Sequence, residues 1–275
     1  MLAARVPDLS RRRARVLLDL GGVFVDGART KQAGRPVKAG QQVVANLGGA
    51  LDRATKVVGT EARARDESGL PPHAIVHADE DLIVVEKPAG LLTAPTPESD
   101  RNNLVSLLTR AGGEKRAIFV VHRIDLDTSG LLVFARNDDT NKALSEMFRK
   151  HDLRREYLVA VAGAVRDSLT LVERPLRGKR AVTHLSVVER FVSATLLRAT
   201  LETGRTHQIR LHLEAEGHPV LGDATYGRRT DRDPPRMALH ATRLAFAHPR
   251  TGAALDFQSP WPADLTPWLE SLRGA

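Results

Sequence analysis

The chain has 275 residues, which is enough for one large or two average domains. It contains no cysteine, which excludes disulfides, thiolate zinc sites and cysteine nucleophiles. Its 41 lysines and arginines outnumber its 33 aspartates and glutamates, and the net charge of +8 is typical of proteins that bind polyanions. Aromatic residues are only 4%, which disfavours an extended base-stacking surface, and no apolar stretch approaches about 20 residues, so we expect no membrane span and a cytoplasmic protein.

The first predicted elements form a small basic unit. Residues 9–21 have the pattern of a helix, with Ser10 as its N-cap and Gly21 at its end. Residues 23–27 read as a strand that enters an Asp-Gly turn, and a second turn and strand follow in 36–44. The start of the helix is dense in arginine and carries candidate contacts to a polyanion: Arg11, Arg12, Arg13 and Arg15. The alternative is a basic helix whose charges only face solvent.

The next stretch, residues 51–72, is predicted to be a linker, because glycine and proline flank a charged segment without apolar periodicity. It separates a unit at 5–50 from a larger domain at 73–270. In the larger domain we predict an amphipathic helix at 139–150 and strands at 82–85, 131–135, 182–188, 194–201 and 243–246. Strands divided by turns, with occasional helices, predict an α+β fold. No glycine-rich phosphate loop is present, so no nucleotide cofactor is expected.

The most informative pattern is the run at 122–136, His-Arg-Ile-Asp-Leu-Asp-Thr-Ser-Gly followed by an apolar strand. It places His122, Arg123, Asp125 and Asp127 within six residues, directly ahead of a turn at Gly130. A charged loop against a rigid core strand can hold a reactive side chain in a fixed position. The alternative is a polar surface loop with an internal Arg–Asp pair.

A second polar pattern lies at 203–212, Thr-Gly-Arg-Thr-His-Gln-Ile-Arg-Leu-His. Thr206 is the expected N-cap of a short helix that ends near Gly217, and Arg205 lies at the strand–helix junction, where it can point into a cleft. His207 and His212 are not expected to bind a metal, because their spacing directs them to different helix faces. Asp127 and Asp223 are interpreted as structural acids in turns.

The run at 122–136 resembles the signature motif of the RluA-type pseudouridine synthases, H-R-L-D-x-x-T-S-G followed by an apolar strand. Three further segments resemble motifs of this family in the expected order: the K-P-x-G turn within 81–90, a basic residue and a tyrosine opening a strand at 155–163, and the segment 203–212 continued by 217–223. The resemblance covers roughly residues 73–265. Residues 5–47 resemble an S4-type RNA-binding module whose leading helix is shortened or missing.

The resemblance implies an α+β catalytic domain with a mixed or antiparallel sheet behind a small α/β S4-like module. It also implies an RNA uridine isomerase that uses neither a cofactor nor a metal. Asp125 would be the catalytic residue, Arg205 its ionic partner, and Tyr157 the aromatic that packs on the target base. Arg123, with His122 beside it, would fill the gap left when the nucleotide flips out of its stack.

Several alternatives remain open at the level of sequence. Cleavage of a glycosidic bond develops positive charge on the sugar, and a carboxylate can stabilise or trap it. Asp125 could attack C1′, attack the base, or remove a sugar proton. An idle RNA-binding or assembly factor on the same scaffold, and a hydrolase with Asp127 or Glu156 as second carboxylate, are the other functions considered. We expect structured RNA as partner, ribosomal RNA ahead of transfer RNA, and a monomer. Residues 93–95 (Thr-Ala-Pro) depart from the family's more usual apolar-His-Pro.

Overall fold

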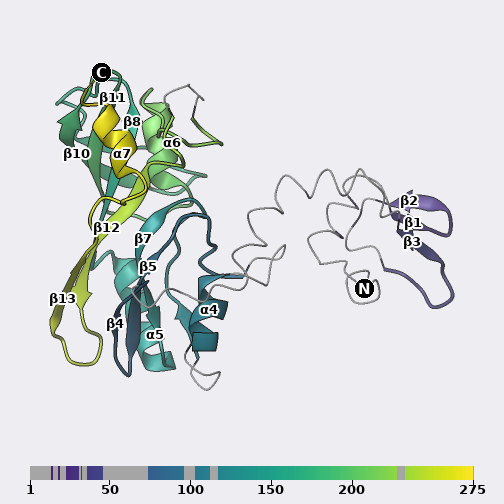
Figure 1. The fold of residues 1–275 in the computed structure, drawn as a ribbon. Coiled ribbons are helices and arrows are strands. Elements are labelled where there is room, and N and C mark those ends of the chain that lie inside the picture. Colours follow the sequence, from purple (N-terminus) through teal and green to yellow (C-terminus); the bar gives the residue numbers. More distant parts are fainter. Residues whose placement is uncertain are drawn as a thin grey trace.

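The structure, a computed structural model, contains two β-sheets in its described residues (Figure 1). It describes residues 14, 18, 23–30, 32, 36–45, 74–95, 103–111, 117–227 and 233–274. The four N-terminal arginines proposed as RNA contacts and the linker predicted at 51–72 therefore lie outside the described residues. Among the residues that are described, no helix is both long and apolar enough to cross a membrane.

The smaller sheet has three antiparallel strands in the order β2-β1-β3, formed by β1 (Val23–Val25), β2 (Ala28–Thr30) and β3 (Val43–Ala45). Asp26 and Gly27 both have positive φ, 50° and 76°, as a two-residue hairpin turn of this type requires. The Asp26 carboxylate also accepts the N–H of Gln42 at 2.8 Å, which fixes the turn to the start of β3. The predicted strand and Asp-Gly turn are confirmed.

The larger sheet has ten strands, eight of them in the order β4-β5-β7-β12-β8-β11-β10-β9, while β13 pairs with β12 and β6 with β7. Neighbours are antiparallel except β7 and β12, which makes the sheet mixed and confirms the predicted α+β class. The strands are β4 (Ile75–Ala78), β5 (Leu82–Lys87), β6 (Phe119–Val120), β7 (Ser129–Ala135), β8 (Arg154–Ala162), β9 (Leu171–Glu173), β10 (Val182–Arg190), β11 (Ala194–Leu201), β12 (Leu239–Ala247) and β13 (Ala254–Gln258).

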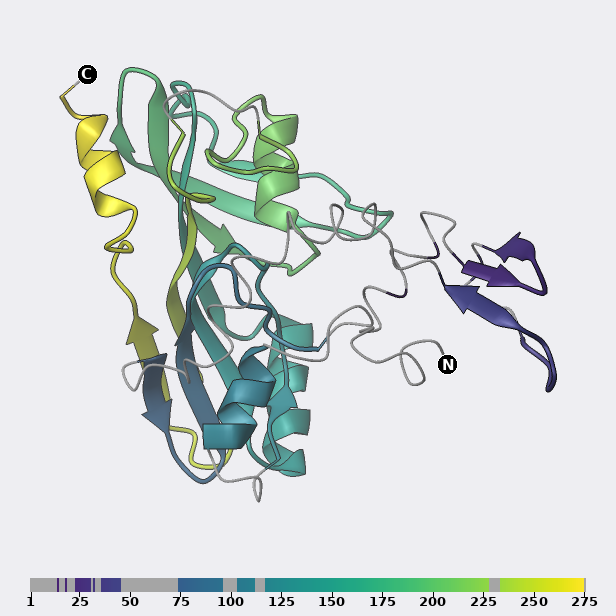
Figure 2. The same cartoon turned by 45° about the vertical axis from the view of Figure 1, so that its right-hand side comes forward.

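Helices cover both faces of this sheet. Helices α4 (Leu104–Ala111) and α6 (Gln208–Ala215) pack in one hydrophobic core with Leu132 and Phe134 of β7. Helix α5 (Asp138–Lys150) packs on the opposite face, against Leu131 and Val133 of the same strand. Helix α7 (Thr266–Ser271) covers that opposite face farther along, so α6 and α7 lie on opposite sides of the strands in Figure 2. Strand β7 is therefore apolar on both faces, as its sequence predicts.

Helix α5 begins and ends at local signals in the sequence. The Asn137 side chain accepts the N–H of Thr140 at 2.9 Å and caps the N-terminus. At the other end His151 takes the left-handed conformation, with φ 61°, and its N–H donates to the Met147 carbonyl. The predicted helix at 139–150 is confirmed and starts one residue earlier. The αL turn at His151 leads the chain directly into β8.

The parallel junction of β7 and β12 is held by close backbone packing and a buried hydrogen-bond chain. Gly130 lies opposite Ala241 with φ 112°, and a Cβ on Gly130 would lie 2.3 Å from the Ala241 carbonyl oxygen, so only glycine fits. Beside it, fully buried His240 is hydrogen bonded through Nδ1 to Ser129 and through Nε2 to Ser259, both at 2.9 Å. This junction fixes the strand that directly follows the Asp125 loop.

Acidification should lower the stability of the folded protein through His240. Burial, and to a lesser extent the charge of Arg236, lowers the pKa of His240 from 6.5 to about 4. Between these values the unfolded chain binds a proton at residue 240 that the folded protein does not, so His240 should contribute about 1.4 kcal/mol per pH unit to the fall of the unfolding free energy on acidification. Urea unfolding between pH 7 and pH 4.5 measures this slope. His240→Asn should reduce the slope of the unfolding free energy against pH by the amount that corresponds to about one proton. Equal slopes in both proteins would contradict the assignment.

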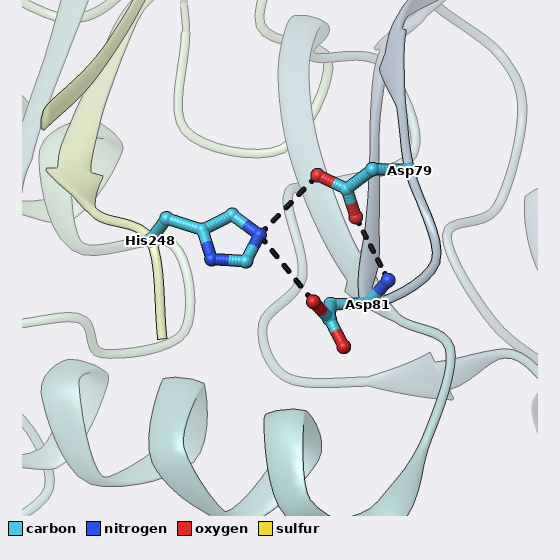
Figure 3. A group of neighbouring side chains, drawn as sticks. All are labelled: Asp79, Asp81 and His248. Carbon is cyan, nitrogen blue, oxygen red and sulfur yellow. Dashed lines mark hydrogen bonds and ion pairs between the residues drawn. The ribbon is translucent and has the colours of Figure 1, made fainter. Parts of the chain in front are cut away.

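The turn between β4 and β5 is fastened to the turn between β12 and β13 by Asp79, Asp81 and His248 (Figure 3). Their polar atoms lie within 4.8 Å of one another, a spacing that a metal ion could bridge. However, His248 Nδ1 accepts the N–H groups of Arg250 and Thr251, so Nε2 carries the proton and donates to the carboxylates. Asp81 is further paired with Arg250 at 2.5 Å. We therefore interpret the group as a structural contact that holds the two turns together.

Candidate active site

A cavity of about 590 Å³ lies where the loop before β7, the first residues of β8 and the segment before α6 meet. This volume suits a nucleotide-sized ligand. All five catalytic-domain residues singled out from the sequence line it: His122, Arg123, Asp125, Tyr157 and Arg205. Among the described residues its lining holds five arginines and a single acid, Asp125.

Asp125 is held by a buried arginine that is itself held by a second acid. Arg210, in the first turn of α6, donates from Nη1 to Asp125 Oδ2 at 2.9 Å. Its Nε and Nη2 donate to the two oxygens of Asp223 at 2.6 and 2.8 Å. Asp223 also accepts the N–H groups of Thr225 and Tyr226, so it is a structural turn acid as predicted. The guanidinium is thereby fixed in a single orientation toward Asp125.

The charges of this group follow from the same contacts. Burial lowers the pKa of Arg210, but the hydrogen bonds to Asp223 and Asp125 outweigh it and raise that pKa above its usual value. Burial likewise raises the pKa of Asp223, whereas Arg210 and two backbone N–H groups bring it below its usual value. Arg210 and Asp223 thus neutralise each other. The negative charge of Asp125 is left facing the cavity.

The predicted ion pair between Asp125 and Arg205 is wrong, because Arg210 occupies that place. The chain enters α6 through His207 in the left-handed conformation, with φ 56°, and His207 rather than the predicted Thr206 is the N-cap. Gln208 accepts the N–H of Arg205 at 3.0 Å, which keeps Arg205 ahead of the helix, and the Arg205 side chain donates to the Arg180 carbonyl. Arg205 still lines the cavity, half-buried at its rim.

His122 has a packing role in this structure. Its ring stacks on Phe148 with centroids 4.3 Å apart, and its Nε2 accepts the N–H of Val133 at 3.1 Å. Burial, together with the charge of Arg155, lowers the pKa of His122 to about 3, so the ring is neutral at physiological pH. Arg123, the next residue, is exposed and free to reach a ligand.

Tyr157 lies at the floor of the cavity, 7% exposed. Burial raises the pKa of its phenol; Arg155 opposes this effect, and the charge of Asp125 adds to it. The hydroxyl is therefore protonated at neutral pH. A rigid, neutral ring in this place can pack against a planar base.

Two further residues fix the backbone around Asp125. Both lie in segments that were compared with the family, but neither was predicted to have a role in the site. Lys87 is fully buried and donates from Nζ to the carbonyls of Pro88, Leu91 and Leu126, at 2.7 to 2.9 Å. Burial lowers the pKa of Lys87 to about 7, against the opposing effect of Asp127 and Asp125. Thr93 donates its hydroxyl to the Ile124 carbonyl at 3.1 Å. The peptide groups on both sides of Asp125 are thus held.

Glu156 cannot serve as a second catalytic carboxylate. It alternates with Tyr157 along β8, so it lies on the other face of the sheet, where its carboxylate is 1% exposed. There it pairs with Arg198 at 2.8 Å, with Arg243 at 3.5 Å, and with Arg154. A two-carboxylate hydrolase is therefore disfavoured, because one acid alone lines the described part of the cavity.

Comparison with known proteins agrees with these features. Residues 81–215 match the family model described as RNA pseudouridylate synthase, and residues 1–43 match that of the S4 domain. An uncharacterised RNA pseudouridine synthase of Bacillus subtilis, YlyB, is 34% identical over 293 residues, which cover 99% of this chain and 92% of the relative. The chain belongs to the RNA pseudouridylate synthase family.

A second relative, the ribosomal large subunit pseudouridine synthase D of Zymomonas mobilis, is 35% identical, with 96% of this chain and 90% of the relative covered. The protein is therefore an RNA pseudouridine synthase of the RluA type with an N-terminal S4 domain, as the four motifs predicted. Human RNA Pseudouridylate Synthase Domain Containing 4 shares the fold, with a TM-score of 0.61 at 23% identity over 73% of this chain and 93% of that one.

Proposed function

We propose that this synthase isomerises uridine in ribosomal RNA, as a cytoplasmic monomer without a cofactor, and that Asp125 is its catalytic residue. The observation that carries the proposal is the position of Asp125 as the single described acid in an arginine-lined cavity, fixed by Arg210. Ribosomal RNA is favoured over transfer RNA because relatives that match nearly the whole chain are named ribosomal large subunit pseudouridine synthase D.

The reaction breaks the N1–C1′ bond and forms a C5–C1′ bond, while C5 loses a proton and N1 gains one, so no atom enters or leaves. Asp125 stabilises or traps the electron-poor sugar. Arg210 keeps the carboxylate oriented, and Tyr157 packs on the base. Arg123 fills the gap in the RNA stack, and Arg205 contacts RNA at the rim, with His122 supporting the wall behind them.

The function is tested with transcripts of large-subunit ribosomal RNA that carry tritium at C5 of uracil. Because C5 loses its hydrogen when it bonds to C1′, isomerisation releases tritium to water, and its amount counts the pseudouridines formed. Transfer RNA transcripts are the control. Release from transfer RNA alone would overturn the ribosomal assignment. An RNA that binds the folded protein without any release would favour the idle binding factor, and free uracil would favour a hydrolase.

We further propose that the S4 domain binds RNA through Arg11, Arg12, Arg13 and Arg15. Changing Arg11, Arg12 and Arg15 to alanine should weaken RNA binding and lower the slope of log K against log salt, by roughly 0.7 to 0.9 for each phosphate that the variant no longer neutralises. Binding titrations at several salt concentrations measure this slope. Turnover at saturating RNA should persist, because the catalytic cavity is unchanged. An unchanged slope would rule the arginine cluster out of RNA binding.

A further inference from the structure

Arg155 is a buried cation without an anion. It is the first inward-facing residue of β8, two residues before Tyr157 on the same face, and it is 7% exposed. Among the described residues no carboxylate lies within ion-pair distance of it, and its Nε and Nη2 have no hydrogen-bond partner. The ring of Phe148 packs against it, with its centroid 5.4 Å from the guanidinium carbon. A buried charge left in this state is costly unless a ligand completes it.

The surroundings of Arg155 in the cavity wall are also positive or unpartnered. His151, which also lines the cavity, has a buried Nδ1 without a partner. Burial lowers the pKa of His151, and the charges of Arg155 and Arg205 lower it further, whereas Glu202, which is paired with Arg180, opposes this effect. Burial likewise lowers the pKa of Arg155, which is the behaviour of a cation that no anion stabilises. This wall therefore favours an incoming negative charge.

Gly204 provides the approach to this wall. It is exposed and lies over the end of Arg155, where a Cβ on residue 204 would be 2.7 Å from Nη1. Its φ lies outside the left-handed region, so the backbone there does not require glycine. The lack of a side chain instead leaves space beside Nη1 at the edge of the cavity, while Nε and Nη2 lie buried behind it. A tetrahedral oxyanion can enter such a notch and accept several N–H donors at once.

We propose that Arg155, with His151 and Arg205 beside it at the Gly204 notch, binds a backbone phosphate that flanks the target uridine. The proposal rests on the proposed function, since it assigns a part of the same RNA substrate. In this arrangement Asp125 faces the sugar that becomes positive. Arg155 binds the phosphodiester and thereby keeps the sugar positioned at Asp125. Arg155 is thus a substrate-binding residue, distinct from Arg210, which is already paired with Asp125 and Asp223.

The test is a double-mutant cycle that combines a substitution in the protein with a change in the RNA backbone. A synthetic hairpin carrying a uridine that the wild-type protein modifies is made with a neutral methylphosphonate at the 5′ or the 3′ phosphate of that uridine. Arg155→Met should raise the dissociation constant and KM for the unmodified hairpin by about 10- to 100-fold, the loss expected for a charge-assisted contact, with kcat changed much less. At one of the two positions the neutral linkage should weaken wild-type binding about tenfold and Arg155→Met binding less than threefold. The position that shows this coupling identifies the phosphate.

Arg149→Met is the matched control, because Arg149 lines the same cavity but is paired with Glu146 on the surface. It should weaken binding to all hairpins equally. If neutral linkages weaken wild type and Arg155→Met equally at both positions, or if Arg155→Met lowers kcat alone, the phosphate site is overturned. Should Arg155→Met fail to fold, Gly204→Ala must reproduce the coupling, and its absence overturns the site as well. Failure of the wild type to modify any uridine would instead refute the proposed function.

Discussion

Asp125→Asn is expected to abolish pseudouridine formation, with a loss of at least about three orders of magnitude in single-turnover rate. Asparagine keeps the shape of the side chain and can still accept a hydrogen bond from Arg210, but it can neither trap nor electrostatically stabilise an electron-poor sugar. RNA affinity should stay within about tenfold, because most contacts to RNA are made by other groups. Tritium release and filter binding on the same RNA separate the two effects.

The internal control for this variant is Asp127→Asn. Asp127 is exposed, two residues farther along the same loop, and does not line the cavity. We expect it to keep most of the activity. An Asp125 variant that works at a near wild-type rate would refute the assignment of the catalytic residue. Two inactive variants would instead mean that the two acids act as a pair.

The second large effect is expected for Arg210→Met. The variant leaves Asp223 buried without a counter-charge, and removal of one partner from a buried ion pair destabilises proteins by about 3–5 kcal/mol. It also frees the Asp125 carboxylate from its fixed orientation, so kcat should fall by about a hundredfold or more. Arg210→Lys should recover little, because a single ammonium cannot reproduce the three-nitrogen contact with both acids. Urea unfolding and single-turnover rates measure the two losses.

Arg205→Met is the matched comparison, since it removes the arginine that the sequence pattern alone favoured as the partner of Asp125. It should leave stability within about 0.5 kcal/mol, as surface substitutions usually do, and act mainly on RNA affinity. A kcat as low as that of Arg210→Met would restore Arg205 as the group that controls Asp125. Equal stability losses in both variants would also contradict the buried ion-pair chain.

The sequence predicts elements well where their signals are local. Helix α5 is predicted within one residue because its amphipathic pattern lies within the helix itself, and its ends are fixed by the adjacent residues Asn137 and His151. Strand β12 is predicted only for 243–246, yet it begins at Leu239, because its first residues are stabilised by pairing with β7 and β8, which lie far away in the chain. Helix α4 was not predicted at all. Its signals are nevertheless local, because Leu104 and Leu108 recur at helical spacing and the Asn103 side chain accepts the N–H of Ser106 at its start.

The same distinction holds for the candidate site. The motifs bring five predicted residues to one cavity, because each motif sits at the end of a strand or helix that the sequence defines. Lys87 and Arg210 were missed as site residues because charged side chains are normally solvated, and only distant partners make their burial favourable. Those partners, Leu126 and Asp125, lie 39 and 85 residues away in the chain. Lys87 and Arg210 both lie within matched motifs, but the spacing inside a motif does not reveal partners so far away.

The insertion of β12 between β7 and β8 has a consequence for chain synthesis. Both neighbours leave the ribosome long before β12 does, so the nascent chain holds Asp125, Tyr157 and Arg210 without the strand that sets their separation. Pairing between elements so distant in sequence forms late in folding. A product that terminates before Leu239 would therefore contain every residue assigned to the chemistry and catalyse nothing, while its unpaired strand edges would favour aggregation.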